Sequence, residues 1–166
     1  FYTRAGDNIH AEFIDAVFGT EAPASSEDQR QAFQDVLAEA LDEKLTFDVV
    51  QTLHDNLVGQ LSERKKDAKP LEVSRREISS LLESCEIPEE KLTAFESRYN
   101  DEFGQGTGLV ASNIVDAKKF EINAGDSVVI DVDPERTDLV EMKRIDGARC
   151  IVIHVEGDVT VNGVEV

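Results

Sequence analysis

The spacing of hydrophobic and polar residues changes near residue 104. Before that point, apolar side chains recur every three or four residues, which places them on one face of an α-helix. After it, apolar and polar residues alternate, which is typical of a strand with one buried face. The sequence therefore predicts an α+β protein: a helical N-terminal part of about five helices, followed by a small antiparallel β-meander.

Capping signals divide the helical part. We expect Ser26 with Gln29, and Ser74 with Glu77, to form capping boxes in which each side chain binds the backbone N–H of the other residue. Thr46 is expected to cap another helix, whose buried stripe includes Val50. The predicted helices lie within residues 7–18, 26–41, 46–61, 74–85 and 88–103.

Two turn signals set the strand register in the last part of the chain. Asp146-Gly147 and Asn162-Gly163 favour two-residue hairpin turns, because both central residues of a type I′ turn need a positive φ. These turns place the following pairs opposite each other: Met142 and Ile151, Val140 and Ile153, Arg144 and Arg149, Val161 and Val164, and Val159 and Val166. The apolar face of the meander is expected to pack on the helical part.

The glycines Gly104, Gly106 and Gly108 suggest where the two parts meet. We interpret residues 1–104 as the helical part, residues 105–112 as a Gly-rich linker, and residues 113–166 as the small β part. The glycine cluster lacks the preceding strand and the following Lys of a phosphate-binding loop, so a hinge is the simpler interpretation.

The formal net charge of −18 is spread along the whole chain. Such a surface disfavours nucleic acid and anionic membranes, which attract Lys and Arg. No apolar run approaches the length of a membrane span. Two distant cysteines and no signal peptide favour the cytoplasm. Because the chain starts at Phe1 and not at Met, we expect a fragment of a longer protein.

A few residues could carry chemistry. Arg144 and Arg149, opposed across a hairpin, repel each other unless a carboxylate or an anionic ligand lies between them. We include His154 with these two arginines as a third candidate ligand-binding residue. An enzyme would need these three residues to converge on one pocket with Cys150 and His54. Cys150 and His154 lie four residues apart on one strand, about 13 Å, so they cannot share a proton directly.

The acidic residues Asp131, Asp133, Glu135 and Asp138 surround an expected turn and form a candidate site for a divalent cation. Their spacing differs from an EF-hand loop, and Pro134 interrupts it. The alternative is a set of strand and turn carboxylates that simply face water.

Several segments together resemble an uncharacterised bacterial family, domain of unknown function 4317. They are residues 12–18, 47–51, 82–85, 113–116, 134–140 and 161–164, read as EFIDAVF, FDVVQ, LESC, NIVD, PERTDLV and VNGV. The resemblance is to the C-terminal region of the family. It implies a bacterial cytoplasmic protein with a further N-terminal region, and it brings no catalytic residues.

No convincing catalytic constellation is visible, so we favour a non-enzymatic module that serves protein interaction or structure within a larger protein. We expect a protein partner, either the missing N-terminal region or another chain, and no cofactor. The alternative is a regulatory or catalytic segment that binds a small anionic ligand or a divalent metal.

Overall fold

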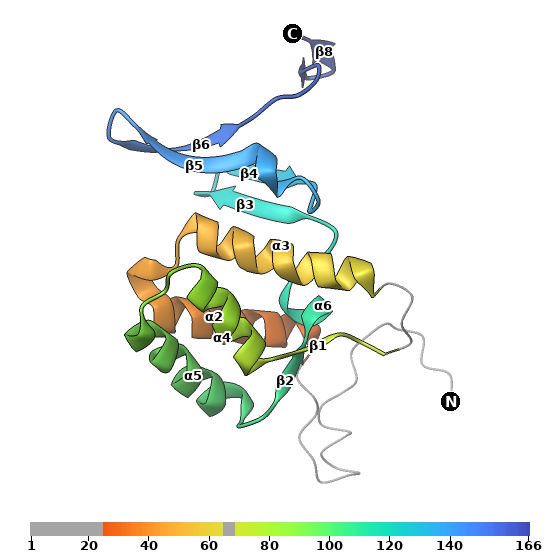
Figure 1. The fold of residues 1–166 in the computed structure, drawn as a ribbon. Helices are drawn as coiled ribbons and strands as arrows, with labels where there is room; N and C mark the ends of the chain where they lie inside the picture. Colours follow the sequence, from red (N-terminus) through yellow and green to blue (C-terminus); the bar gives the residue numbers. More distant parts are fainter. Residues whose placement is uncertain (1–24, 65–68) are drawn as a thin grey trace.

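The computed structural model describes residues 25–64 and 69–166. The chain is an α+β protein, with most helices before residue 104 and antiparallel strand pairs after it (Figure 1). The helix expected within residues 7–18 lies outside the described residues. The described helices are α2 (Ser26–Leu41), α3 (Phe47–Glu63), α4 (Arg75–Ser84), α5 (Glu89–Phe103) and the short α6 (Ala111–Ile114), with 3₁₀ turns η1 (Asp42–Lys44) and η2 (Thr137–Leu139).

The first capping box lies one residue earlier than the sequence analysis placed it. Ser25, and not Ser26, precedes α2 in an extended conformation, and its hydroxyl accepts the N–H of Asp28. The carboxylate of Asp28 in turn accepts the backbone N–H of Ser25. A carboxylate accepts a stronger hydrogen bond than the amide of Gln29 and also suits the positive end of the helix dipole, which explains the shift.

The other two predicted caps are confirmed. The hydroxyl of Thr46 accepts the N–H of Val49 at the start of α3. Ser74 and Glu77 form the capping box of α4. The hydrogen bonds from the Ser74 side chain and backbone hold the pKa of the Glu77 carboxyl below its usual value.

The apolar stripes of the helices meet in one core. This core contains Phe33, Leu37 and Leu41 from α2, Leu53 and Leu57 from α3, Ile78 and Leu82 from α4, and Phe95 and Tyr99 from α5. Val50 was wrongly assigned to the buried stripe, since its side chain is 41% exposed. It lies on α3 one residue after the buried Val49, at the solvent-facing edge of that stripe.

The glycine-rich segment is built into the helical part. Strand β2 (Gly108–Val110) pairs with β1 (Glu72–Ser74), and the side chains of Leu109 and Ala111 are completely buried. The Tyr99 hydroxyl also donates to the carbonyl of Thr107 at 2.9 Å. Residues 108–112 therefore differ from the linker that the glycines suggested, while the proposed division of the chain into domains stays a prediction.

The last part of the chain consists of three hairpins: β3 (Phe120–Ala124) with β4 (Val128–Val132), β5 (Val140–Ile145) with β6 (Ala148–Ile153), and β7 (Thr160–Val161) with β8 (Val164–Glu165). The register predicted for β5–β6 and β7–β8 is confirmed at every strand pair. Asp146, Gly147, Asn162 and Gly163 all have the positive φ that the turns require.

Helix α3 separates the helical core from the first two hairpins (Figure 1). A second, smaller core of Phe120, Ile122 and Val140 packs against Phe47 at the start of this helix. Polar contacts from the same helix add to it: Asp55 accepts the hydroxyl of the buried Thr137. The helix thus contacts these hairpins through both apolar and polar side chains.

Candidate functional site

Exposed hydrophobic side chains are concentrated in the hairpins. Within the described residues, ten of the eleven large hydrophobic side chains that face solvent lie between Val128 and Val166. The helices before them bury nearly all of theirs. A concentration of exposed apolar side chains is typical of a binding surface. The hairpins are therefore the candidate binding region of this protein.

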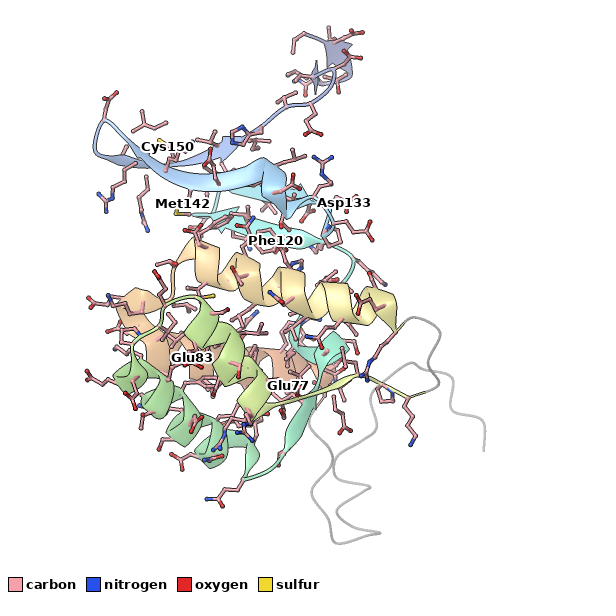
Figure 2. All side chains as sticks on the ribbon, in the orientation of Figure 1. Glu77, Glu83, Phe120, Asp133, Met142 and Cys150 are labelled. Atoms are coloured by element: carbon pink, nitrogen blue, oxygen red, sulfur yellow. The ribbon has the colours of Figure 1, made fainter. Side chains whose placement is uncertain are left out.

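The β5–β6 hairpin carries apolar side chains on both faces. Its inner face includes Val140 and Ile151, which pack in the smaller core. Met142 and Ile153 share this face and are 40% and 51% exposed. We call the opposite side the outer face and define its apolar part as Ile145, Ala148, Cys150 and Val152. Figure 2 shows Met142 and Cys150 on opposite sides of this hairpin. Strands that are apolar on both faces are usually covered on both faces.

Two charged side chains lie on the outer face itself, with Glu141 opposite Val152 and Lys143 opposite Cys150. Glu141 accepts hydrogen bonds from Lys143 and from the ring of His154, 2.7 Å away. The Lys143 ammonium, and then His154, hold the pKa of the Glu141 carboxyl below its usual value. His154 is thus hydrogen-bonded at the end of the hairpin that lies far from the Asp146-Gly147 turn.

A second apolar surface lies on the β7–β8 hairpin. Val159, Val161, Val164 and Val166 share one face, because Val161 pairs with Val164 and the N–H of Val166 donates to Val159. We call residues 155–166 the valine arm. Every residue of this arm is exposed. The arm extends away from the rest of the protein (Figure 1), so its valine face lies open.

Arg144 and Arg149 are cross-strand partners, as predicted. With Thr46, Phe47 and Asp48 they line a hollow of about 210 Å³ at the start of α3. In the described part of the chain, neither arginine forms an ion pair with a carboxylate. His154 lies about 17 Å along the strand from Arg149, so the structure separates it from the two arginines with which it was grouped.

The residues that an enzyme would have needed in one pocket are scattered. His54 is buried in α3, where its ring nitrogens contact the Asp55 carboxylate and the carbonyl of Asp116. Cys150 and His154 lie on the outer side of the β5–β6 hairpin, and the two arginines lie on its inner side. The structure therefore does not bring this set together.

Three of the four acidic candidates for a metal site, Asp131, Asp133 and Asp138, pair with a cation or with the backbone. Asp131 lies 3.5 Å from the ammonium of Lys119, and Asp133 accepts the N–H of Glu135. Asp138 pairs with Arg136, whose guanidinium holds the pKa of that carboxyl below its usual range. Residues 25–64 and 69–166 contain no group of three His, Cys, Asp or Glu side chains arranged to hold a metal ion.

One groove was not predicted. It has a volume of about 530 Å³ and lies between α2, α3 and β3, where Arg30, Phe33, His54 and Phe120 are among its lining residues. The Phe120 ring packs 4.8 Å from the His54 ring, centre to centre. Each residue occupies an ordinary position on its own helix or strand, so nothing in the sequence indicated that they would meet.

The described residues form an α+β protein whose hairpins expose apolar side chains. No helix in residues 25–64 or 69–166 combines the length and hydrophobicity needed to cross a membrane. The model of the family described as Domain of unknown function (DUF4317) matches residues 1–164, and the chain belongs to this family. No curated protein and no solved structure matches the chain.

Proposed function

We propose that this chain is a non-enzymatic protein-interaction module whose docking surface is the outer face of the β5–β6 hairpin. The contrast in burial supports this proposal. The helices cover their apolar stripes, whereas Ile145 on the outer face is 49% exposed and the neighbouring hairpins add further exposed valines. A domain that buries its helical core this thoroughly and leaves its strands open has a surface suited to a partner.

The strand pairing supports the same proposal. Two strands alone are only marginally stable in water, and neither β5 nor β6 pairs with a third strand in the described part of the chain. An extended partner segment can add to a free strand edge through backbone hydrogen bonds. Its alternate side chains then cover the outer face.

Local charge indicates the chemistry of the partner. Residues 140–153 contain Lys143, Arg144 and Arg149 but only two carboxylates, Glu141 and Asp146, in a chain whose net charge is −18. The hairpin is thus slightly basic within an acidic protein. Only Lys143 among these cations lies on the outer face, where it is paired with Glu141. We therefore infer that the partner offers an extended segment whose alternate side chains are mainly apolar.

We also propose that the protein works in the bacterial cytoplasm. Cys85 and Cys150 are both free thiols, which suits a reducing compartment. The high negative charge disfavours nucleic acid and anionic membranes as partners, which leaves proteins as the preferred class.

Site-specific photo-crosslinking tests the docking surface. A photoreactive amino acid replaces Ile145 on the outer face or, as a control, the exposed Glu90 on α5. In lysate of the source cells we expect a discrete adduct from position 145 and none from position 90. Val152→Asp should weaken that adduct, with an unchanged circular dichroism spectrum as the check on folding. Equal adducts from both positions, or none from position 145, would contradict the proposal.

A second candidate function is the binding of a small anion by Arg144 and Arg149. The supporting observation is their position beside the N-terminal end of α3, where backbone N–H groups and the helix dipole favour negative charge. The probe is inorganic phosphate in a thermal unfolding assay. Phosphate should raise the melting temperature of the wild type but not of the Arg144→Gln, Arg149→Gln double variant. Equal shifts in both proteins would exclude the site.

A further inference from the structure

The groove between α2, α3 and β3 has the size and surface of a small-molecule site. Its volume of about 530 Å³ falls within the roughly 300–1,000 Å³ that such sites occupy. Its apolar lining includes Phe33, Leu37, Leu53 and Phe120, the last of which reaches from β3 toward α3 (Figure 2). Val50 also lines the groove, and it is the one strongly exposed large hydrophobic side chain that precedes Val128 in the described part of the chain.

Polar contacts hold the walls of the groove together. On α2, the Nε of Arg30 donates to the carbonyl of Asn113 of α6 at 3.4 Å, and the side-chain amide of Asn113 donates to Gln29 at 3.0 Å. On α3, the Nε2 of His54 lies 3.2 Å from the carbonyl of Asp116, in the segment that leads to β3. The groove is therefore formed before a ligand arrives, which lowers the cost of binding.

Arg30 gives the groove a positive charge that is available to a ligand. Among the other charged lining residues, Lys119 pairs with Glu121, and the Asp116 carboxylate accepts the backbone N–H of Lys118. Within the described residues, the Arg30 guanidinium forms no ion pair with a carboxylate. A guanidinium presents its N–H donors in a planar fork that matches the two oxygens of a carboxylate.

We propose that this groove binds a small organic acid, whose flat apolar body contacts Phe33, Leu53 and Phe120 and whose carboxylate pairs with Arg30. A ring-shaped body suits the site, because two phenylalanine rings and the His54 ring line it. None of the lining residues belongs to β5 or β6, so the groove is separate from the docking surface proposed above. Either site can fail in experiment while the other stands.

Fluorescence anisotropy with 2-naphthoate as the probe tests the pairing. The chain contains no Trp, so protein emission does not obscure the probe. We expect saturable binding with a dissociation constant below about 1 mM, as is usual for a ligand of this size. Arg30→Gln should weaken binding at least about tenfold. The control Arg76→Gln makes the same charge change at an exposed position on α4 and should alter binding less than about twofold.

The neutral analogue 2-naphthalenemethanol separates the charge from the ring without any change to the protein. It should bind the wild type at least about tenfold more weakly than 2-naphthoate, and Arg30→Gln should leave its affinity unchanged. Absence of saturable naphthoate binding, equal affinities for the acid and the alcohol, or equal effects of the two arginine variants would overturn the proposal.

Methyl NMR of the wild-type chain locates the bound probe. The methyl signals of Leu37, Val50 and Leu53 should shift on addition of 2-naphthoate, because these side chains line the groove. The methyl signals of Val161 and Val164, which are exposed on β7–β8, should stay in place. Shifts confined to the exposed valines would mean that the probe coats the hairpins. Unchanged signals throughout would mean that the groove is closed to ligands, and either result would overturn the site.

Discussion

Replacement of Thr137 by Val tests the joint between helix α3 and the hairpins. The Thr137 side chain is 3% exposed, and its hydroxyl lies 2.7 and 2.8 Å from the two carboxylate oxygens of Asp55. Valine keeps the side-chain volume nearly unchanged, so the variant removes the hydrogen bond without a cavity. A hydrogen bond to a charged group contributes about 1.5–3 kcal/mol. Because the Asp55 side chain is 44% exposed, water replaces part of this contact, and we expect a loss of about 1.5 kcal/mol.

Urea denaturation of the wild type, Thr137→Val, Asp55→Ala and the double variant measures this contribution. A thermodynamic cycle should give a coupling of about 1 kcal/mol between the two residues. Hydrogen exchange adds a local readout: the amide of His154, bonded to Leu139 beside Thr137, should exchange faster. Thr160→Val, at an exposed position, should change stability by less than about 0.5 kcal/mol. Additive effects of the two variants would refute the assignment of Thr137 and Asp55 as a joint.

Three further predictions concern the helical part. Leu109→Ala should lower the free energy of unfolding by about 2–5 kcal/mol, because Leu109 is completely buried. If chemical denaturation shows a loss below about 0.5 kcal/mol, residues 105–112 form a loose linker and this account of them is wrong. Burial raises the pKa of Tyr99 to about 12, so the folded state holds this proton more tightly than the unfolded state. Stability should then decline from pH 10 toward pH 12, and Tyr99→Phe should lack this part of the decline when unfolding is followed against pH. Ser74→Ala should cost about 1 kcal/mol at neutral pH. Ser74 lowers the pKa of Glu77, so the part of this contribution that depends on the Glu77 carboxylate is present above the ordinary carboxyl pKa and disappears as acid protonates Glu77 in the folded protein. The stability difference between the variant and the wild type should therefore narrow in acid.

Local signals in the sequence predicted local structure well. Ser74 with Glu77 identified the start of α4, because the cap depends on residues only three positions apart. Asp146-Gly147 fixed the register of a whole hairpin, because the positive φ values of the turn leave one pairing of the strands. In the same way the hairpin rule predicted that Arg144 would lie opposite Arg149.

Contacts between distant residues could not be predicted in the same way. The glycines around residue 106 indicated a break in the chain, but nothing local showed that Leu109 would pair with Val73 of β1 and enter the core. The contact between His54 and Phe120 likewise joins a helix to a strand 66 residues later in the sequence. The alternation of apolar and polar residues identified the apolar positions of the hairpins. Which of these side chains remain exposed depends on tertiary contacts, such as those with helix α3, that the local sequence does not specify.

We expect the outer face of the β5–β6 hairpin to be exposed to solvent in the free chain and to be covered when the partner protein is bound. Carbene footprinting of the dilute purified chain and of the chain in lysate of its source cells tests it directly. Residues 145–152 should be heavily labelled in the first sample and protected in the second, with equal labelling of the exposed side of α5. Weak labelling of residues 145–152 in the dilute chain, or the same labelling in both samples, would contradict the account.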